Sequence, residues 1–122
     1  MKMYIAVLDD FPDYMTPTLV AHSVLAAHME FVKAHTDLAR IVDDGPYKYP
    51  QYIDWLQDSF KKCVVRVGQK EFDKIKSLPA VHVGHEKNTL EGRDSCIVVC
   101  PYSDDEPLPN VLKFAKLWKP KS

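Results

Sequence analysis

The chain has 122 residues, the size of one domain built around one hydrophobic core, so we expect residues 1–122 to form a single domain. Hydrophobic residues make up 46% and charged residues 27%, with only 4 glycines, a composition that excludes disorder, collagen-like repeats and low-complexity sequence. The 16 Lys and Arg nearly balance the 17 Asp and Glu, so a polyanionic partner would have to meet a local basic patch.

The first half of the chain predicts one strand and two helices. The run Tyr4 to Leu8 is typical of a buried strand, and the acidic segment Asp9 to Asp13 indicates a loop at its carboxyl end. Thr16, a suitable N-cap, opens a long amphipathic helix, whose apolar face comprises Val20, Val24, Ala27 and Phe31. A shorter helix is expected over Pro50 to Ser59.

The second half predicts three strands and two helices. The strands are expected over Cys63 to Val67, Ala80 to Val83 and Ser95 to Cys100, the last one stopped by Pro101. A helix over Gln69 to Lys76 and a polar loop over Gly84 to Arg93 separate them. A closing helix would bury Val111, Phe114, Ala115 and Trp118. This order of elements predicts a three-layer α/β domain with four strands.

Neither the apolar runs nor the first segment of the sequence indicates a membrane protein. Its longest apolar runs, Met3 to Leu8 and Cys96 to Cys100, are far shorter than the roughly 20 residues of a spanning helix. The first run leads directly into acidic residues, so no signal peptide is indicated. We expect a cytoplasmic protein without membrane contact. Its three cysteines should be reduced thiols in strands.

Histidines are the first candidates for chemistry. Three of them, His22, His28 and His35, fall on the long helix, where His22 points away from the apolar face. In a strand His82 and His85 would face opposite sides, and no Cys or Asp stands at zinc-ligand spacing. The sequence also lacks a Gly-rich phosphate loop, a nucleophile elbow and a Cys-x-x-Cys pair. We therefore expect no metal site and no cofactor.

Two basic segments are the second candidates. The segment Lys61 to Lys76 holds six basic residues against Glu71 and Asp73. The tail after Glu106 contains four lysines and no acidic residue: Lys113, Lys116, Lys119 and Lys121. Clustered cations beside aromatic residues can hold an RNA backbone. The alternative is that these lysines form ordinary solvated helix faces.

The succession of segments resembles one known family. The segments that carry the resemblance are Tyr4 to Asp10, Met15 to Ala27, Lys61 to Val67, the polar Gly84 to Gly92, Ser95 to Pro101 and Val111 to Trp118. Over nearly the whole chain they look like the type II peptidyl-tRNA hydrolases. The resemblance implies a single α/β domain with a mixed four-stranded sheet and helices on both faces. It also implies cleavage of the ester that links a peptide to tRNA.

The chain departs from the family pattern at two positions. The family has a catalytic lysine at the start of its long helix, where this chain has Thr18 or Leu19. The family also has an Asp-Ala-Gly segment before the last strand, which here corresponds to His82-Val83-Gly84 or to the nearby His85-Glu86. Two matches remain: the threonine entering that strand corresponds to Ser95, and Asp10 is retained.

Ester hydrolysis needs an activated water or nucleophile and a donor for the developing oxyanion. Where the chain departs from the family pattern, we expect His85 to act as the base and Ser95 as the donor, with Asp10 in the catalytic group. We expect Thr18 and His22 to contact the substrate, His22 in place of a family glutamine. The tRNA would then be bound by Lys61 and Lys62.

Without the family lysine, we expect RNA binding with weak or absent hydrolysis. The alternatives are a non-catalytic protein that binds tRNA or another nucleotide, and a structural or partner-binding domain. A homodimer is a further candidate assembly.

Overall fold

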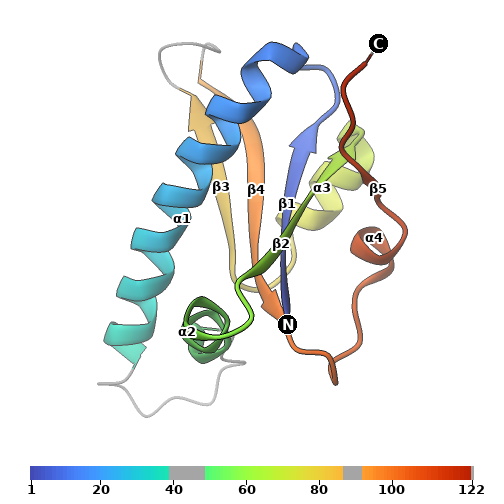
Figure 1. The fold of residues 1–122 in the computed structure, drawn as a ribbon. Helices are drawn as coiled ribbons and strands as arrows, with labels where there is room; N and C mark the ends of the chain where they lie inside the picture. Colours follow the sequence, from blue (N-terminus) through green and yellow to red (C-terminus); the bar gives the residue numbers. More distant parts are fainter. Residues whose placement is uncertain (39–48, 87–91, 122) are drawn as a thin grey trace.

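The structure is a computed structural model that describes residues 1–38, 49–86 and 92–121 (Figure 1). In chain order the elements are β1 (Lys2–Leu8), the 3-10 helix η1 (Asp13–Met15), α1 (Thr16–Leu38), α2 (Tyr49–Gln57), β2 (Lys61–Val67), α3 (Gln69–Lys76), β3 (Val81–Glu86), β4 (Arg93–Tyr102), α4 (Asn110–Lys113) and β5 (Lys116–Leu117). Within the described residues the fold is therefore α/β, with one mixed sheet and four α-helices.

The sheet is built around β1 and β4. Its strand order is β3-β4-β1-β2-β5, with β1 parallel to β2 and the other neighbours antiparallel. Consecutive residues Ile5, Ala6, Val7 and Leu8 are all buried, although alternate residues of a strand point to opposite faces. Both faces of β1 are therefore covered, which explains why this strand is a continuous apolar run and not an alternating one.

Helix α1 packs on β3 and β4 through a row of residues four apart. The buried row is Leu19, Ser23, Ala27 and Phe31. Ala27 and Phe31 confirm the predicted face. Val20 and Val24 are only partly buried at its edge, because the contact follows the i, i+4 row that begins at Leu19.

The other helices complete the core. Helix α2 contacts α1 and β4 and buries Tyr52 and Trp55, with the Tyr52 ring edge-on to Phe31 at 5.2 Å between centroids. Helix α3 contacts β1, β2 and β4 and buries Phe72 and Ile75.

The predicted closing helix and the predicted count of four strands are wrong. Helix α4 ends at Lys113, and Phe114 is 72% exposed. Lys116–Leu117 pairs with β2 as a fifth strand, and the Trp118 amide donates to the Val64 carbonyl at 2.9 Å. This pairing satisfies backbone groups at the free edge of β2, which a longer helix would leave open.

The predicted bounds of the last two long strands are also wrong. Gly84 and His85 belong to β3, and Arg93 begins β4, so the predicted polar loop over Gly84 to Arg93 overlaps both strands. Strand β4 also passes Pro101 and ends at Tyr102. The register between β1 and β4 shifts near Pro101, and such an irregularity tolerates a residue without an amide hydrogen.

Two further predictions concern the cysteines and the membrane. Cys63 in β2 and Cys96 and Cys100 in β4 are thiols in strands that form no disulfide, as predicted. Burial raises the pKa of the Cys63 thiol above its ordinary value. Among the described residues, no helix is both long and apolar enough to cross a membrane.

Candidate functional site

A pocket lies where β1 ends and β4 begins, on the side of the sheet that α3 covers. It has a volume of about 440 Å³ and is lined by Leu8, Gln69, Phe72, Lys76, His85, Gly92, Arg93 and Asp94. Leu8 and Phe72 are buried apolar residues, whereas the remaining side chains are polar or charged. The pocket thus combines an apolar floor with a polar rim, as small-ligand sites do.

Asp94 connects two basic side chains in this pocket. One carboxylate oxygen lies 3.1 Å from His85 Nδ1, and the other accepts a hydrogen bond of 2.5 Å from Lys76 Nζ. The hydrogen bond from Lys76 is the largest cause that holds the pKa of Asp94 below its ordinary value; the His85 hydrogen bond also lowers it, and burial opposes both. An ionised Asp94 favours the His85 tautomer with hydrogen on Nδ1, which leaves Nε2 able to accept a proton.

Gly92 keeps the other side of the His85 ring open. A Cβ atom at Gly92 would lie 3.5 Å from His85 Nε2, so any longer side chain would crowd the proton-accepting nitrogen. Gly92 also has a φ of +78°, a conformation that glycine adopts without steric cost. The site therefore places a bare backbone where a substrate or a water would meet the imidazole.

Asp10 reaches this pocket only through Arg93. Arg93 donates to the Asp10 carboxylate at 2.6 Å, and its guanidinium lies 4.9 Å from the centroid of the Phe11 ring. Arg93 is half exposed, so it can contact a ligand while keeping this ion pair. Arg93 thus connects the sequence-predicted residue Asp10 to the pocket that contains His85.

Ser95 lies on the opposite face of the sheet from His85. Its side chain is fully buried, and its hydroxyl lies 3.5 Å from the Gly84 carbonyl. Gly84 in turn packs directly against Ser23 of α1. Adjacent residues of a strand alternate between faces, so Asp94 points toward α3 and Ser95 toward α1. The structure does not bring the predicted donor and the predicted base together.

The two predicted substrate contacts on α1, Thr18 and His22, are exposed. They lie beside the buried row, and His22 is exposed, as its predicted position off the apolar face requires. His82 also faces α1, with Nδ1 2.5 Å from a carboxylate oxygen of Glu30. This contact confirms that His82 and His85 lie on opposite faces. In the part of the chain that is described, no three potential ligands are grouped to hold a metal ion.

Lys61 and Lys62 lie at the opposite end of the sheet from the pocket. Lys2 pairs with Lys61 and Leu8 with Val67 in parallel register, so about 20 Å of strand separates the lysines from Leu8 at the pocket. The Lys62 ammonium sits 3.3 Å from the centroid of the Phe60 ring.

The surroundings of Lys61 and Lys62 are acidic. A second pocket beside the chain terminus is lined by Met1, Asp54, Gln57, Asp58, Ser59, Ser103, Asp104 and Asp105. Lys61 is close enough to contribute to the lowered pKa of Asp104, although the terminal amino group is the largest cause. The four carboxylates of this pocket, of which Asp104 is within electrostatic reach of Lys61, disfavour a phosphate backbone here.

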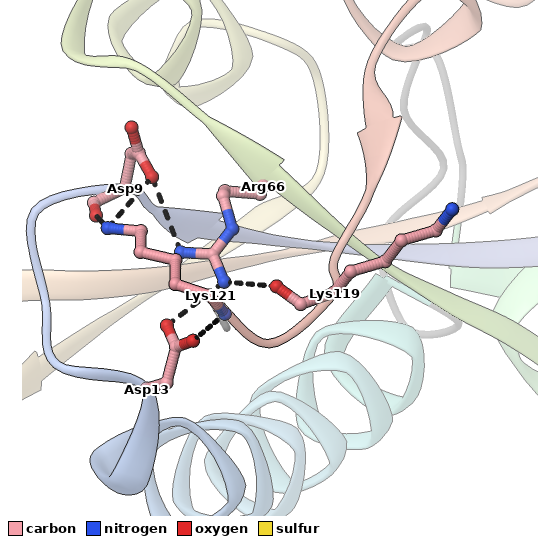
Figure 2. Close-up of polar contacts among 5 residues, drawn as sticks. All are labelled: Asp9, Asp13, Arg66, Lys119 and Lys121. Carbon is pink, nitrogen blue, oxygen red and sulfur yellow. Dashed lines mark hydrogen bonds and ion pairs between the residues drawn. The ribbon is translucent and has the colours of Figure 1, made fainter.

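A second polar cluster joins the C-terminal segment to the loop after β1 (Figure 2). Arg66 of β2 donates to Asp9 at 3.3 Å, to Asp13 at 3.0 Å and to the Lys119 carbonyl at 2.6 Å. The Lys121 amide donates to the other Asp13 oxygen, and its ammonium donates to the Asp9 carbonyl at 3.0 Å. We call these five residues the clasp. Asp9 and Asp13 are engaged there and are not part of the pocket.

Three residues of the pocket were missed by the sequence interpretation: Lys76, Arg93 and Asp94. The signal for two of them is local, since Arg93 and Asp94 stand just before the strongly apolar run Cys96 to Cys100. Strand alternation then places Asp94 on the face opposite Ser95. Lys76 carries no such signal, because its role depends on how α3 lies across β4.

Compared with protein-family models and with curated proteins, the chain matches no family and no relative.

Proposed function

We propose that the chain is a peptidyl-tRNA hydrolase-like protein of the cytoplasm whose pocket hydrolyses a tRNA ester slowly. Its fold would be the three-layer arrangement that the resemblance implies, with the fifth strand as an addition. The observation that carries the proposal is the hydrogen bond between His85 and Asp94 inside a pocket that also holds Lys76 and Arg93. A histidine oriented by a carboxylate is the usual form of a general base.

The chemistry requires one water molecule. His85 Nε2 removes a proton as the water oxygen bonds to the ester carbonyl carbon. Arg93 and Lys76 are the donors available to the negative charge that develops on the carbonyl oxygen. The bond between the acyl carbon and the ribose oxygen then breaks, and the imidazolium gives its proton to that oxygen, which leaves as the ribose hydroxyl. Asp94 stabilises the imidazolium between these steps. Ser95 has a packing role in this scheme.

A second candidate function is binding of tRNA or another nucleotide without turnover. Lys76 is already bound to Asp94, and Arg93 to Asp10, so each cation is partly neutralised before a substrate arrives. His85 is also 47% exposed, and water in an open site weakens electrostatic stabilisation of a transition state. These features favour weak catalysis, and in the limit binding alone.

A hydrolysis assay tests the proposal. With an N-acylated aminoacyl-tRNA as substrate, His85→Ala should lower kcat by about 10²- to 10⁴-fold, and Asp94→Asn should lower it because the tautomer is no longer enforced. His35→Ala, which removes a histidine from α1, is the matched control and should leave kcat unchanged. Equal rates for His85→Ala and wild type would exclude this pocket. If the wild-type protein binds the tRNA but releases no acyl group, the second candidate function is established.

Assembly is a separate part of the proposal. Leu25 and Met29 of α1 are 68% and 72% exposed and lie one turn apart, so a homodimer would use this face. Sedimentation of the wild type and of Leu25→Lys would test it, since the substitution should lower the mass of a dimer to that of a monomer.

A further inference from the structure

A cleft between α3 and α4 has the composition of a nucleotide-binding site. Its volume is about 430 Å³, and it is lined by Glu71, Lys74, Asn110, Val111, Phe114 and Ala115. Phe114 follows directly after α4 and is 72% exposed. Exposing an aromatic ring to solvent at the edge of a cleft is unfavourable for the free protein, and the ring offers a surface on which a base can stack.

The elements beside the cleft carry cations, and the Lys113 ammonium lies 5.6 Å from the centroid of the Phe114 ring. Lys70 and Lys74 lie one turn apart on α3, and Lys113 and Lys116 stand on either side of Phe114 in the chain. Among the described residues none of these four lysines is in an ion pair, whereas Lys76 and Lys121 are paired with carboxylates.

Only one acidic side chain, Glu71, lines the described cleft. The neighbouring Asp73 accepts a hydrogen bond from Gln69 at 2.8 Å. The lining itself holds one cation, Lys74, against Glu71. Lys70, Lys113 and Lys116 on the adjoining segments outnumber Asp73, so the surroundings of the cleft are basic in a chain whose total charge is -1.

We propose that this cleft binds single-stranded nucleic acid, with one base stacked on Phe114 and the adjoining phosphates against Lys74 and Lys113. The aliphatic side chains of Val111 and Ala115 would contact the base, and the amide of Asn110 can donate to or accept from its edge. Stacking on an aromatic ring accepts any base, and lysines contact phosphates regardless of sequence.

The cleft and the His85 pocket lie on opposite sides of α3. Glu71 and Lys74 line the cleft, whereas Gln69, Phe72 and Lys76 line the pocket. The two are separated by one helix diameter, about 10–12 Å. This inference rests on the proposed function, because it identifies where the RNA strand that carries the ester would be held. A strand bound in the cleft can cross α3 and deliver its end to His85.

Equilibrium binding of a fluorescently labelled single-stranded RNA of about 12 nucleotides tests the cleft. Phe114→Ala should raise Kd about tenfold and leave the salt dependence of binding unchanged, because it removes stacking alone. Lys74→Gln should reduce the slope of log K against log salt by about 0.7, because it removes one phosphate contact. Tyr14→Ala and Lys33→Gln, an exposed aromatic and an exposed lysine elsewhere, are the matched controls and should change neither quantity.

Each outcome bears on one idea. RNA binding that Phe114→Ala and Lys74→Gln leave unchanged would overturn the cleft, and so would an absence of RNA binding at low salt. The hydrolysis assay with His85→Ala is read separately, so His85-dependent turnover with an unaffected Phe114→Ala would remove the cleft and keep the proposed function. RNA binding that depends on Phe114 and Lys74, without any turnover, would keep the cleft and remove the proposed hydrolysis. Thermal unfolding of both variants should match wild type, since Phe114 and Lys74 are exposed.

Discussion

Gly84 shows how a single small residue positions the candidate site. It is buried where α1 crosses β3, and an added Cβ would collide with Ser23 Oγ and lie 3.2 Å from Ser95 Oγ. The absence of a side chain therefore sets the approach of the helix to the strand. His85 follows Gly84 directly, so the same contact fixes where the imidazole leaves β3. Ser95, which the resemblance suggested as a catalytic donor, is one of the residues that fill this contact.

Gly84→Ala should destabilise the protein by about 1–3 kcal/mol, because the core must move to accept a methyl group. Gly68→Ala is the matched control, since its Cβ would meet only the flexible end of Glu71, at 3.1 Å from Oε2. Urea unfolding followed by circular dichroism measures both. A Gly84→Ala protein as stable as Gly68→Ala would show that α1 and β3 are not held this closely.

Most elements were predictable because their signals are local. The apolar runs of β1, β2 and β4 and the helical spacing along α1 each depend on neighbouring residues. The structure confirms these four elements and, on the predicted face of α1, Ala27 and Phe31. The C-terminal segment was not predictable in this way. Val111, Phe114 and Trp118 have helical spacing, yet Trp118 instead binds the edge of β2 and packs 5.0 Å from the Arg66 guanidinium. Contacts to a distant strand outweigh the weak propensity of a short helix.

The candidate site was predictable only in part for the same reason. His85 and Asp10 were identified from the sequence, and both belong to the pocket neighbourhood. Their partners Asp94 and Arg93 depend on the pairing of β3 with β4 beyond the predicted ends, where His85 lies opposite Asp94. The polar sequence predicted a loop from Gly84 to Arg93, although His85 pairs with Asp94 and Glu86 with Arg93 as strand. A one-residue difference along β4 then decides which side chain faces His85.

Helix α1 provides a matched test of its orientation. Ala27 is 1% exposed and faces the sheet, whereas Ala21 is exposed on the same helix. Ala27→Asp should cost several kcal/mol, because it buries an unpaired charge. Ala21→Asp should change stability by less than about 1 kcal/mol. If thermal melts show that both substitutions lower Tm equally, the buried row through Leu19 and Phe31 is contradicted.

At the scale of the whole molecule, the clasp connects the chain's C-terminal segment to the loop after β1. Arg66 lies between them with only 15% of its side chain exposed, and Figure 2 shows its guanidinium facing Asp9, Asp13 and the Lys119 carbonyl. Hydrogen bonds to charged groups are stronger than neutral ones. The clasp therefore holds β5 against β2, and with β5 the segment that places Phe114 at the α3–α4 cleft.

The clasp should make stability depend on acid pH. The backbone hydrogen bond from Lys121 is the largest cause that lowers the pKa of Asp13 below its ordinary value of 3.8, and Arg66 lowers it further. A carboxyl whose pKa is lower in the folded protein binds protons more readily when unfolded. Its stabilising contribution is therefore complete above about pH 3.8 and is lost as the pH falls toward the folded value.

Asp13→Asn removes this titration, so the variant should be less stable than wild type at pH 7 and the difference should shrink as the pH falls below 4. Asp105→Asn, an exposed carboxylate beside the chain's N-terminus, is the control and should follow wild type at every pH. Urea midpoints at a series of pH values measure the effect. Because the clasp is partly exposed, added salt should also reduce the difference at pH 7. A stability difference between Asp13→Asn and wild type that stays constant down to pH 3 would show that Asp13 does not titrate with the fold, and the C-terminal segment would then be held by β5 and Trp118 alone.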